Sequence, residues 1–147
     1  AESPEREMTT AIDLDAILNT SPFARFLAIA ARADERGVLA TMPVRDQLVG
    51  NVMLPALHGG CVASFLEIAC LLQLAHAVGT AAPARAINIS VEYLRPARRE
   101  TTYARAQIRR LGKRVAVVHA EAWQQDESKP VCLLQSHLRL PAGLTAE

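Results

Sequence analysis

The chain has 147 residues, 50% of them hydrophobic, and its 16 basic and 15 acidic side chains leave a net charge of +1. This length fits one domain, which buries roughly 70% of the surface that its unfolded chain exposes. The balanced charge argues against nucleic acid as the main partner, because phosphate contacts need a concentrated excess of Lys and Arg. The cysteines lie among apolar neighbours without metal-type spacing to histidine, which favours reduced, buried thiols in a cytoplasmic protein.

The N-terminal residues are polar and mixed in charge, without the basic-then-apolar order of a secretory signal. Residues 60–78 are mostly apolar and long enough to suggest a membrane span. However, Glu67 lies near their middle, and a central ionisable group costs about 3 kcal/mol on insertion scales. We therefore expect a helix buried inside a soluble protein and no membrane partner.

The N-terminal half predicts short elements. Residues 1–11 suit a loose tail and residues 13–18 a short helix, whereas residues 23–33 could form a helix turn that leads into a strand. Residues 37–44, after a turn, are typical of a strand. We expect residues 1–22 to be an N-terminal tail and short helix, and residues 23–147 to be a single domain.

The centre of the chain predicts one long helix. A loop with Gly50 and Pro55 as breakers continues to about Leu57, and the helix then runs from about residue 59 to residue 78. This segment is apolar nearly all round, as expected of a helix that is wrapped by other structure.

From Ala86 onward the hydrophobic period changes to two. Apolar residues alternate with polar ones up to Tyr93, which predicts a half-buried strand. Residues 101–111, 114–124 and 131–140 repeat the pattern, separated by short turns, so we expect an antiparallel meander of four strands. A long helix before such a sheet predicts an α+β fold in which the sheet curls around the helix.

Glu67 is the strongest indication of function. Between Asp46 and Arg85 it is the one charged side chain in 38 residues. Burial without a partner disfavours the ionised form, so such a carboxylate is either neutral and inert or a tuned acid, base or nucleophile.

The tripeptide His58-Gly59-Gly60 lies at the expected helix start, nine positions before Glu67. Free N–H groups and the positive end of the helix dipole there suit a developing negative charge, and the glycines allow a ligand carbonyl close approach. Helix geometry puts Glu67 roughly 13 Å along the axis from this start. If both groups act on one substrate, two subunits must therefore build the site.

Several motifs together resemble the hotdog-fold acyl-CoA thioesterases of the phenylacetic-acid-degradation (PaaI-like) type, over about residues 37–140. The spacing of His-Gly-Gly to the acidic residue and the strand that ends in Leu-Arg-Pro-Ala are the most specific of them. The motifs are Gly50-Asn51, Leu57-His58-Gly59-Gly60, Glu67, residues 91–97 and residues 110–116. The resemblance implies a hotdog fold, a dimer or dimer-of-dimers tetramer with sites at the subunit interface, and hydrolysis of acyl-CoA without metal or cofactor.

The resemblance also implies roles for individual residues. Glu67 matches the catalytic carboxylate, as general base or nucleophile, and Gly59, with Gly60 beside it, matches the oxyanion donor. His58 shapes the helix start, where a histidine is more often a cap than a proton shuttle. Asn51 helps to place the water or the carbonyl, although turn chemistry also accounts for it.

The phosphates of CoA are expected to meet basic side chains. The candidates are Arg95 in the Leu-Arg-Pro-Ala motif and a group in the hairpin after it: Arg109, Arg110, Lys113 and Arg114.

Two other functions remain open. A hotdog hydratase or dehydratase would pair a catalytic histidine with a carboxylate. A non-catalytic acyl-CoA-binding or regulatory protein is the other alternative, because Ala86 stands where relatives often carry Ser or Thr, so a hydroxyl that would assist the water is missing.

Overall fold

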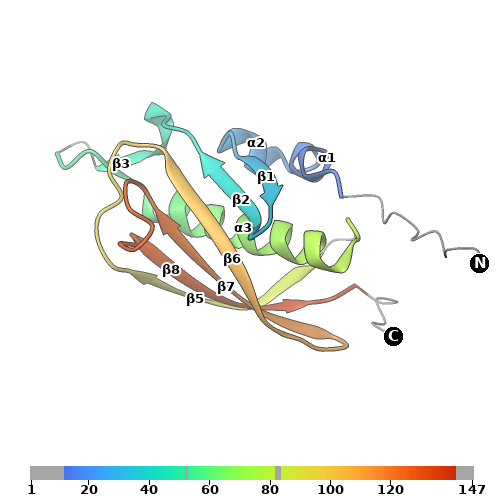
Figure 1. Ribbon diagram of the computed structural model, residues 1–147. Coiled ribbons are helices and arrows are strands. Elements are labelled where there is room, and N and C mark those ends of the chain that lie inside the picture. The colour runs from blue at the N-terminus through green and yellow to red at the C-terminus, as the bar shows by residue number, and fades with distance from the viewer. Residues whose placement is uncertain (1–11, 52, 82–83, 142–147) are drawn as a thin grey trace, which may run out of the picture.

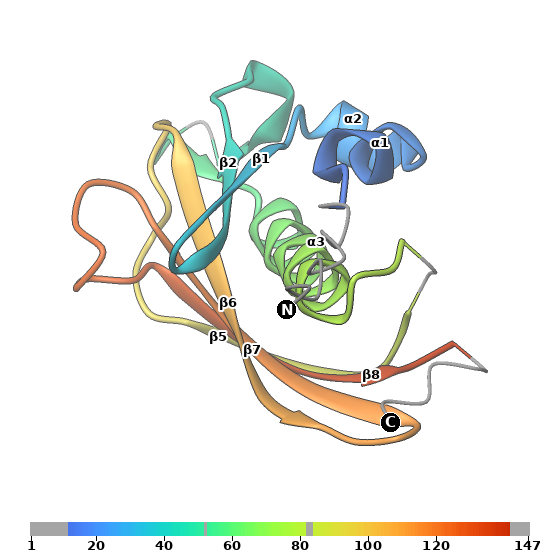
Figure 2. The ribbon, with the colours of Figure 1, turned by 45° about the vertical axis from the view of Figure 1, so that its right-hand side comes forward.

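The structure, a computed structural model, describes residues 12–51, 53–81 and 84–141. A six-stranded antiparallel sheet curls around one long helix, and two short helices pack beside that helix (Figure 1, Figure 2). The helices are α1 (Leu14–Asn19), α2 (Pro22–Phe26) and α3 (Gly59–Val78), with a 3-10 turn, η1 (Asp46–Leu48). The strands are β1 (Ala30–Asp34), β2 (Gly37–Met42), β3 (Val49–Asn51), β4 (Ala56–Leu57), β5 (Arg85–Tyr93), β6 (Thr102–Leu111), β7 (Val115–Trp123) and β8 (Cys132–Arg139). The predicted α+β hotdog fold is confirmed.

Helix α3 has the bounds that the sequence predicts, because both ends carry capping residues. His58 is the N-cap, and Gly79 ends the helix in the left-handed conformation, with φ 78° and its N–H donated to Ala75 O at 2.9 Å. One side of α3 packs on β2, β6, β7 and β8. Although α3 is long and apolar enough to span a membrane by length and composition alone, this packing makes it the central helix of the domain.

The predicted order of the strands is wrong at one point. Strands β6, β7 and β8 form a meander, but β5 pairs with β8, so the order is β1-β2-β6-β7-β8-β5. Residues 94–101 carry the chain past the start of α3 to β6, and Ala97 O accepts a hydrogen bond from Leu57 N at 2.8 Å on the way. Hydrophobic periodicity reports which face of a strand is buried and carries no information about its neighbours.

Strand β5 is also more exposed than a half-buried strand. Its residues Ile89 and Tyr93 lie opposite Ser136 and Cys132, which are buried on the helix side of the sheet. Yet Ile89 is 41% and Tyr93 56% exposed, because α3 packs mainly on β2, β6, β7 and β8 and meets this edge strand at its first residue, Gly59. An apolar strip at the edge of the sheet is therefore left uncovered in one chain.

The N-terminal half follows the prediction with additions. The ambiguous segment contains α2 and β1, and β2 begins at Gly37 and ends at Met42, two residues before the expected end. The expected loop before α3 contains η1 and the small β3–β4 sheet. The tail expected at residues 1–11 lies outside the described residues.

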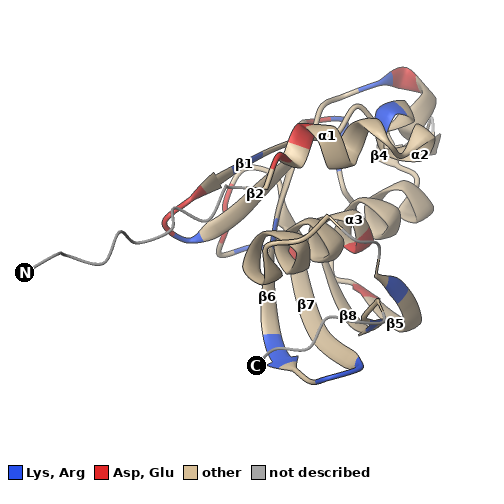
Figure 3. Ribbon diagram, turned by 90° about the vertical axis from the view of Figure 1, so that its right-hand side faces the viewer, with Lys and Arg blue, Asp and Glu red and all other residues tan. Residues whose placement is uncertain are grey.

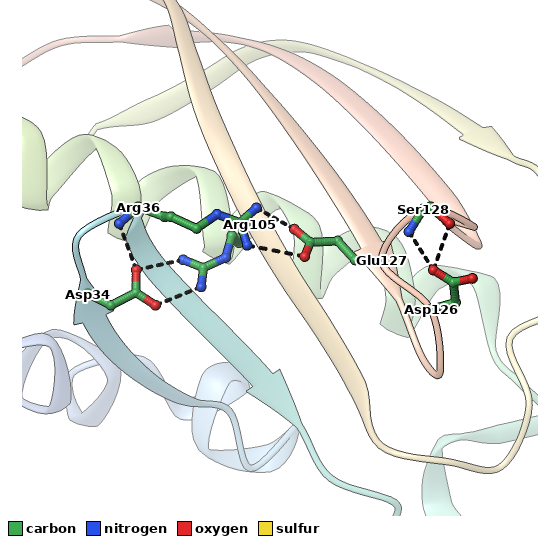
Figure 4. A network of polar contacts seen from close by, with 6 residues as sticks. All are labelled: Asp34, Arg36, Arg105, Asp126, Glu127 and Ser128. Carbon is green, nitrogen blue, oxygen red and sulfur yellow. Dashed lines mark hydrogen bonds and ion pairs between the residues drawn. The ribbon is translucent and has the colours of Figure 1, made fainter.

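A polar network joins the β1–β2 turn to the outer side of the sheet (Figure 4). Asp34 accepts two hydrogen bonds from the guanidinium of Arg105, at 3.0 and 2.7 Å, and one from the backbone N–H of Arg36 at 2.9 Å. The Arg105 guanidinium lowers the pKa of Asp34 from 3.8 to about 2. Arg36 in turn forms a 2.6 Å ion pair with Glu127 in the β7–β8 loop.

This network predicts acid sensitivity. Because the folded-state pKa of Asp34 is depressed, its stabilising contribution is present above pH 3.8 and is lost as the pH falls toward about 2. The free energy of unfolding of the wild type should therefore decrease over that interval by more than that of Asp34→Asn. Denaturant unfolding at a series of pH values measures this difference, and parallel curves for the two proteins would contradict it.

Candidate functional site

The start of α3 is fixed by its neighbours in sequence and in space. The backbone N–H of His58 is donated to Leu48 O at 2.7 Å, which ties the helix start to η1. The Nδ1 of His58 accepts the N–H of Gly60 at 3.0 Å. His58 is thus a helix cap, and its Nδ1 and the Gly60 N–H are already paired with each other.

Gly59 differs from Gly60. Among the described residues its N–H has no hydrogen-bond partner, whereas its carbonyl accepts the hydroxyl of Tyr93 at 2.9 Å. A Cβ at Gly59 would lie 3.2 Å from the Tyr93 ring, so the close approach of this ring favours glycine. The available donor at the helix start is therefore Gly59, held in place by Tyr93.

Tyr93 was not among the residues predicted for the site. Tyr93 is the last residue of β5, next to the Leu-Arg-Pro-Ala motif, but the alternation of apolar and polar residues in this strand predicts only that its side chain packs against other apolar groups. The contact with Gly59 depends on how β5 lies against the helix start, which the sequence does not reveal.

Glu67 lies on the half-exposed face of α3. It has no hydrogen bond or ion pair with any described residue, and it lies on one helical stripe with Gly60, Ser64, Leu71 and Ala75. From Gly59 to Glu67 the helix rises roughly 12 Å, so the carboxylate and the Gly59 N–H of one chain do not meet at one carbonyl. In one chain Glu67 is half-buried rather than enclosed.

Asn51 forms a turn. Its Oδ1 accepts the N–H groups of Met53 at 3.0 Å and Leu54 at 3.3 Å, which shapes the loop between β3 and β4. The side chain is exposed, and its NH₂ group is not used in these hydrogen bonds. A role for this NH₂ group toward water or substrate remains a prediction.

A pocket of about 420 Å³ opens beside the helix start. It brings together two of the predicted residues, Gly59 and Arg95, and Tyr93 also lines it. The Arg95 side chain is exposed, so a negatively charged group that extends from this pocket could reach it.

The basic hairpin lies elsewhere. Arg109, Arg110, Lys113 and Arg114 are exposed at the β6–β7 tip, where Figure 3 shows a concentration of blue ribbon in contrast to the nearly uncharged α3. Strand β6 has 10 residues, which separates this tip from the helix-start end of the sheet by roughly 30 Å. Within one chain, the hairpin and Gly59 are not parts of one site.

The cysteines are free thiols. Burial raises the pKa of Cys70 to about 12 and that of Cys132 to about 11, so neither is a thiolate near neutral pH. Among the described residues, no group of three His, Cys, Asp or Glu side chains is placed to hold a metal ion.

Comparison with known proteins decides the family. The thioesterase superfamily profile matches residues 54–131, more than half of the chain. The chain belongs to the thioesterase superfamily. This confirms the resemblance and the predicted class of enzyme, a thioester hydrolase.

Individual relatives agree. The chain is 29% identical over 127 residues to the medium/long-chain acyl-CoA thioesterase YigI of Escherichia coli K12, covering 72% of this chain and 77% of the relative. The PaaI protein of the E. coli phenylacetic acid degradation operon is 26% identical, with a TM-score of 0.72 over 88% of this chain and 91% of PaaI. A Shewanella oneidensis protein related to the superfamily, 21% identical, has a TM-score of 0.77 over 87% of this chain and 92% of its own, which supports the fold alone.

Proposed function

We propose that the protein hydrolyses acyl-CoA thioesters to a carboxylic acid and CoA in the cytoplasm, at sites shared between two subunits. One observation carries the proposal: α3 presents a helix-start N–H without a described partner and, roughly 12 Å further along, an isolated carboxylate. The named activity of YigI supports acyl-CoA as the substrate.

In this mechanism the thioester oxygen accepts the Gly59 N–H of one subunit, which stabilises the negative charge of the tetrahedral intermediate. Glu67 of the other subunit either takes a proton from the attacking water or attacks the carbonyl carbon itself. The C–S bond then breaks, and CoA leaves as a thiolate that takes up a proton. In the first route the carboxylic acid forms directly from the attacking water. In the second route the acyl group stays on Glu67 as a mixed anhydride, which water hydrolyses to release the acid and restore the carboxylate. His58 caps the helix and the Tyr93 hydroxyl binds the carbonyl of Gly59, so both position the residue that carries the donor.

A two-fold dimer would bring the two halves of the site together. The two-fold axis that places Gly59 of one chain opposite Glu67 of the other must cross α3 midway between these two residues, near residues 63 and 64. The two helices would then run antiparallel and cover each other's N-terminal halves. The half-exposed Ser64 and Glu67 lie on the stripe that such contact would cover.

Strand β5 offers the matching edge. It is nine residues long, lies at the end of the sheet and exposes Ile89 and Tyr93 on the helix side. A long apolar edge strand is a template for pairing with another chain, and antiparallel pairing with itself gives a closed two-fold dimer. Further pairing of dimers to a tetramer is compatible with this arrangement.

A panel of acyl-CoA esters tests the proposal. Hydrolysis releases a free thiol, which a colorimetric thiol reagent measures, whereas hydration of an enoyl-CoA does not. Tight binding of the esters without thiol release would instead favour a regulatory role, and product formation without thiol release would favour a hydratase.

The hairpin gives a separate prediction. In an antiparallel dimer the hairpin end of one subunit points toward the helix-start end of the other, where it could meet CoA phosphates in trans. Such contacts lie remote from the thioester and act equally in ground and transition states, so they appear in KM. Lys113→Ala/Arg114→Ala should therefore raise KM for acyl-CoA several-fold at low salt, with kcat little changed.

The rise in KM for acyl-CoA should become smaller as added salt shortens the Debye length to about 8 Å near physiological ionic strength. A short thioester without the nucleotide should be hydrolysed as by the wild type. Arg25→Ala/Lys129→Ala removes the same charge from other exposed positions and serves as the control. Equal losses on both thioesters would assign the hairpin to folding or assembly.

A further inference from the structure

An apolar pocket of about 240 Å³ lies between the short N-terminal helices and the C-terminal half of α3. Its walls include Ile17 of α1, Leu71, Ala75 and Val78 of α3, and Leu140 just after β8. None of the described residues that line it is charged.

The polar groups in the wall offer little to a polar ligand. The hydroxyl of Thr20 is donated to Ile17 O at 2.7 Å, and the hydroxyl oxygen of Ser21 accepts the N–H of Ala24 at 3.2 Å. Both therefore serve the ends of α1 and α2, and Thr80, the third hydroxyl residue of the wall, also has a partner. The lining of the pocket therefore suits a hydrocarbon occupant.

The pocket continues the stripe that contains Glu67. Leu71 follows Glu67 by one helical turn, and Ala75 follows Leu71 by another, so the carboxylate lies at the N-terminal end of the apolar wall. From Glu67 to Ala75 the helix rises roughly 12 Å. In the dimer proposed above, the partner helix covers residues near 63 and 64 and leaves this wall free.

We propose that this pocket holds the acyl chain of the substrate and selects acyl groups of medium length, an inference that rests on the proposed function. An engineered apolar cavity of about 150 Å³ binds benzene, so each of its six carbon atoms corresponds to about 25 Å³ of cavity volume. On that scale the pocket accommodates about eight to ten carbon atoms. The acyl carbonyl lies near Glu67, and the chain runs along α3 toward Val78.

The test is chain-length selectivity in a variant with a filled pocket. For the wild type, kcat/KM should rise about fourfold for each added methylene from butyryl- to octanoyl- or decanoyl-CoA and then level off. Ala75→Phe should lower kcat/KM for decanoyl-CoA at least about tenfold and change that for butyryl-CoA less than about twofold. Ala77→Phe is the matched control, because Ala77 is exposed on the same helix and does not line the pocket.

If Ala75→Phe lowers kcat/KM equally for all chain lengths, the proposal is overturned. It is also overturned if Ala75→Phe changes the oligomeric state and leaves the selectivity as it was, because the pocket is then occupied by a second copy of the chain. If the wild type hydrolyses no acyl-CoA, the proposed function fails by itself. The pocket is then tested by calorimetric titration with decanoate. Binding to the wild type and to Ala77→Phe but not to Ala75→Phe supports it, and equal binding or no binding overturns it.

Discussion

Glu67→Gln should abolish thioester hydrolysis while the protein keeps its fold and its affinity for acyl-CoA. The amide has nearly the same size as the carboxylate but can neither take a proton from water nor attack a carbonyl carbon. Loss of a general base or nucleophile lowers kcat by at least about 10²-fold. Because Glu67 has no hydrogen bond or ion pair with any described residue, its neutralisation removes no native contact there, so the melting temperature should stay close to that of the wild type.

Glu121→Gln is the matched control for this substitution. Glu121 is exposed on β7, and the control removes the same charge without reaching α3. Thiol release under single-turnover conditions measures chemistry apart from product release, and calorimetry with a non-hydrolysable thioether of CoA measures binding. A Glu67→Gln enzyme that keeps more than half of the wild-type rate would remove Glu67 from the mechanism.

The local structure follows from local chemistry, and this is where the sequence predicts well. The bounds of α3 are set by His58 and Gly79, residues whose capping behaviour is independent of the rest of the fold. The neighbour of β5 is set by the path of residues 94–101 around the helix start, so alternation in the strands could not predict it. The exposure of β5 has the same origin, because a pattern indicates which side is apolar and not whether another element covers it.

The candidate site divides in the same way. The isolation of Glu67 in an apolar helix is visible in the sequence. The sequence does not show which of the two glycines has a free N–H. This depends on the rotamer of His58, which pairs with Gly60, and on Tyr93, which holds Gly59 from a distant strand. The Asx turn of Asn51 likewise depends on the conformation of the β3–β4 loop.

Mixed dimers test whether two chains build one site. Gly59→Pro removes the proposed oxyanion donor, and Glu67→Gln removes the carboxylate, so each variant alone should be inactive. A dimer with one subunit of each kind has one site with both groups intact and one site with neither. Random exchange makes about half of the dimers mixed, so about a quarter of wild-type activity should return on mixing. Subunits with different affinity tags allow the mixed dimers to be purified and assayed by thiol release.

The backbone at Gly59 suits proline, but the Tyr93 ring must shift to admit a Cβ that would lie 3.2 Å away, so the oligomeric state of Gly59→Pro is checked before mixing. Gly59 is the first residue of α3, where proline is tolerated because its N–H makes no helical hydrogen bond, and His58 before it has φ −60° and ψ 128°, the extended conformation that a following proline favours. Gly59→Ala places a similar Cβ against Tyr93 but keeps the N–H, so it should retain activity within a few-fold of the wild type. If purified mixed dimers stay inactive while Gly59→Ala is active, the carboxylate and the donor act within one chain or Glu67 acts elsewhere. Recovery in the mixed dimers alone requires that Gly59 of one subunit and Glu67 of the other meet at the same thioester.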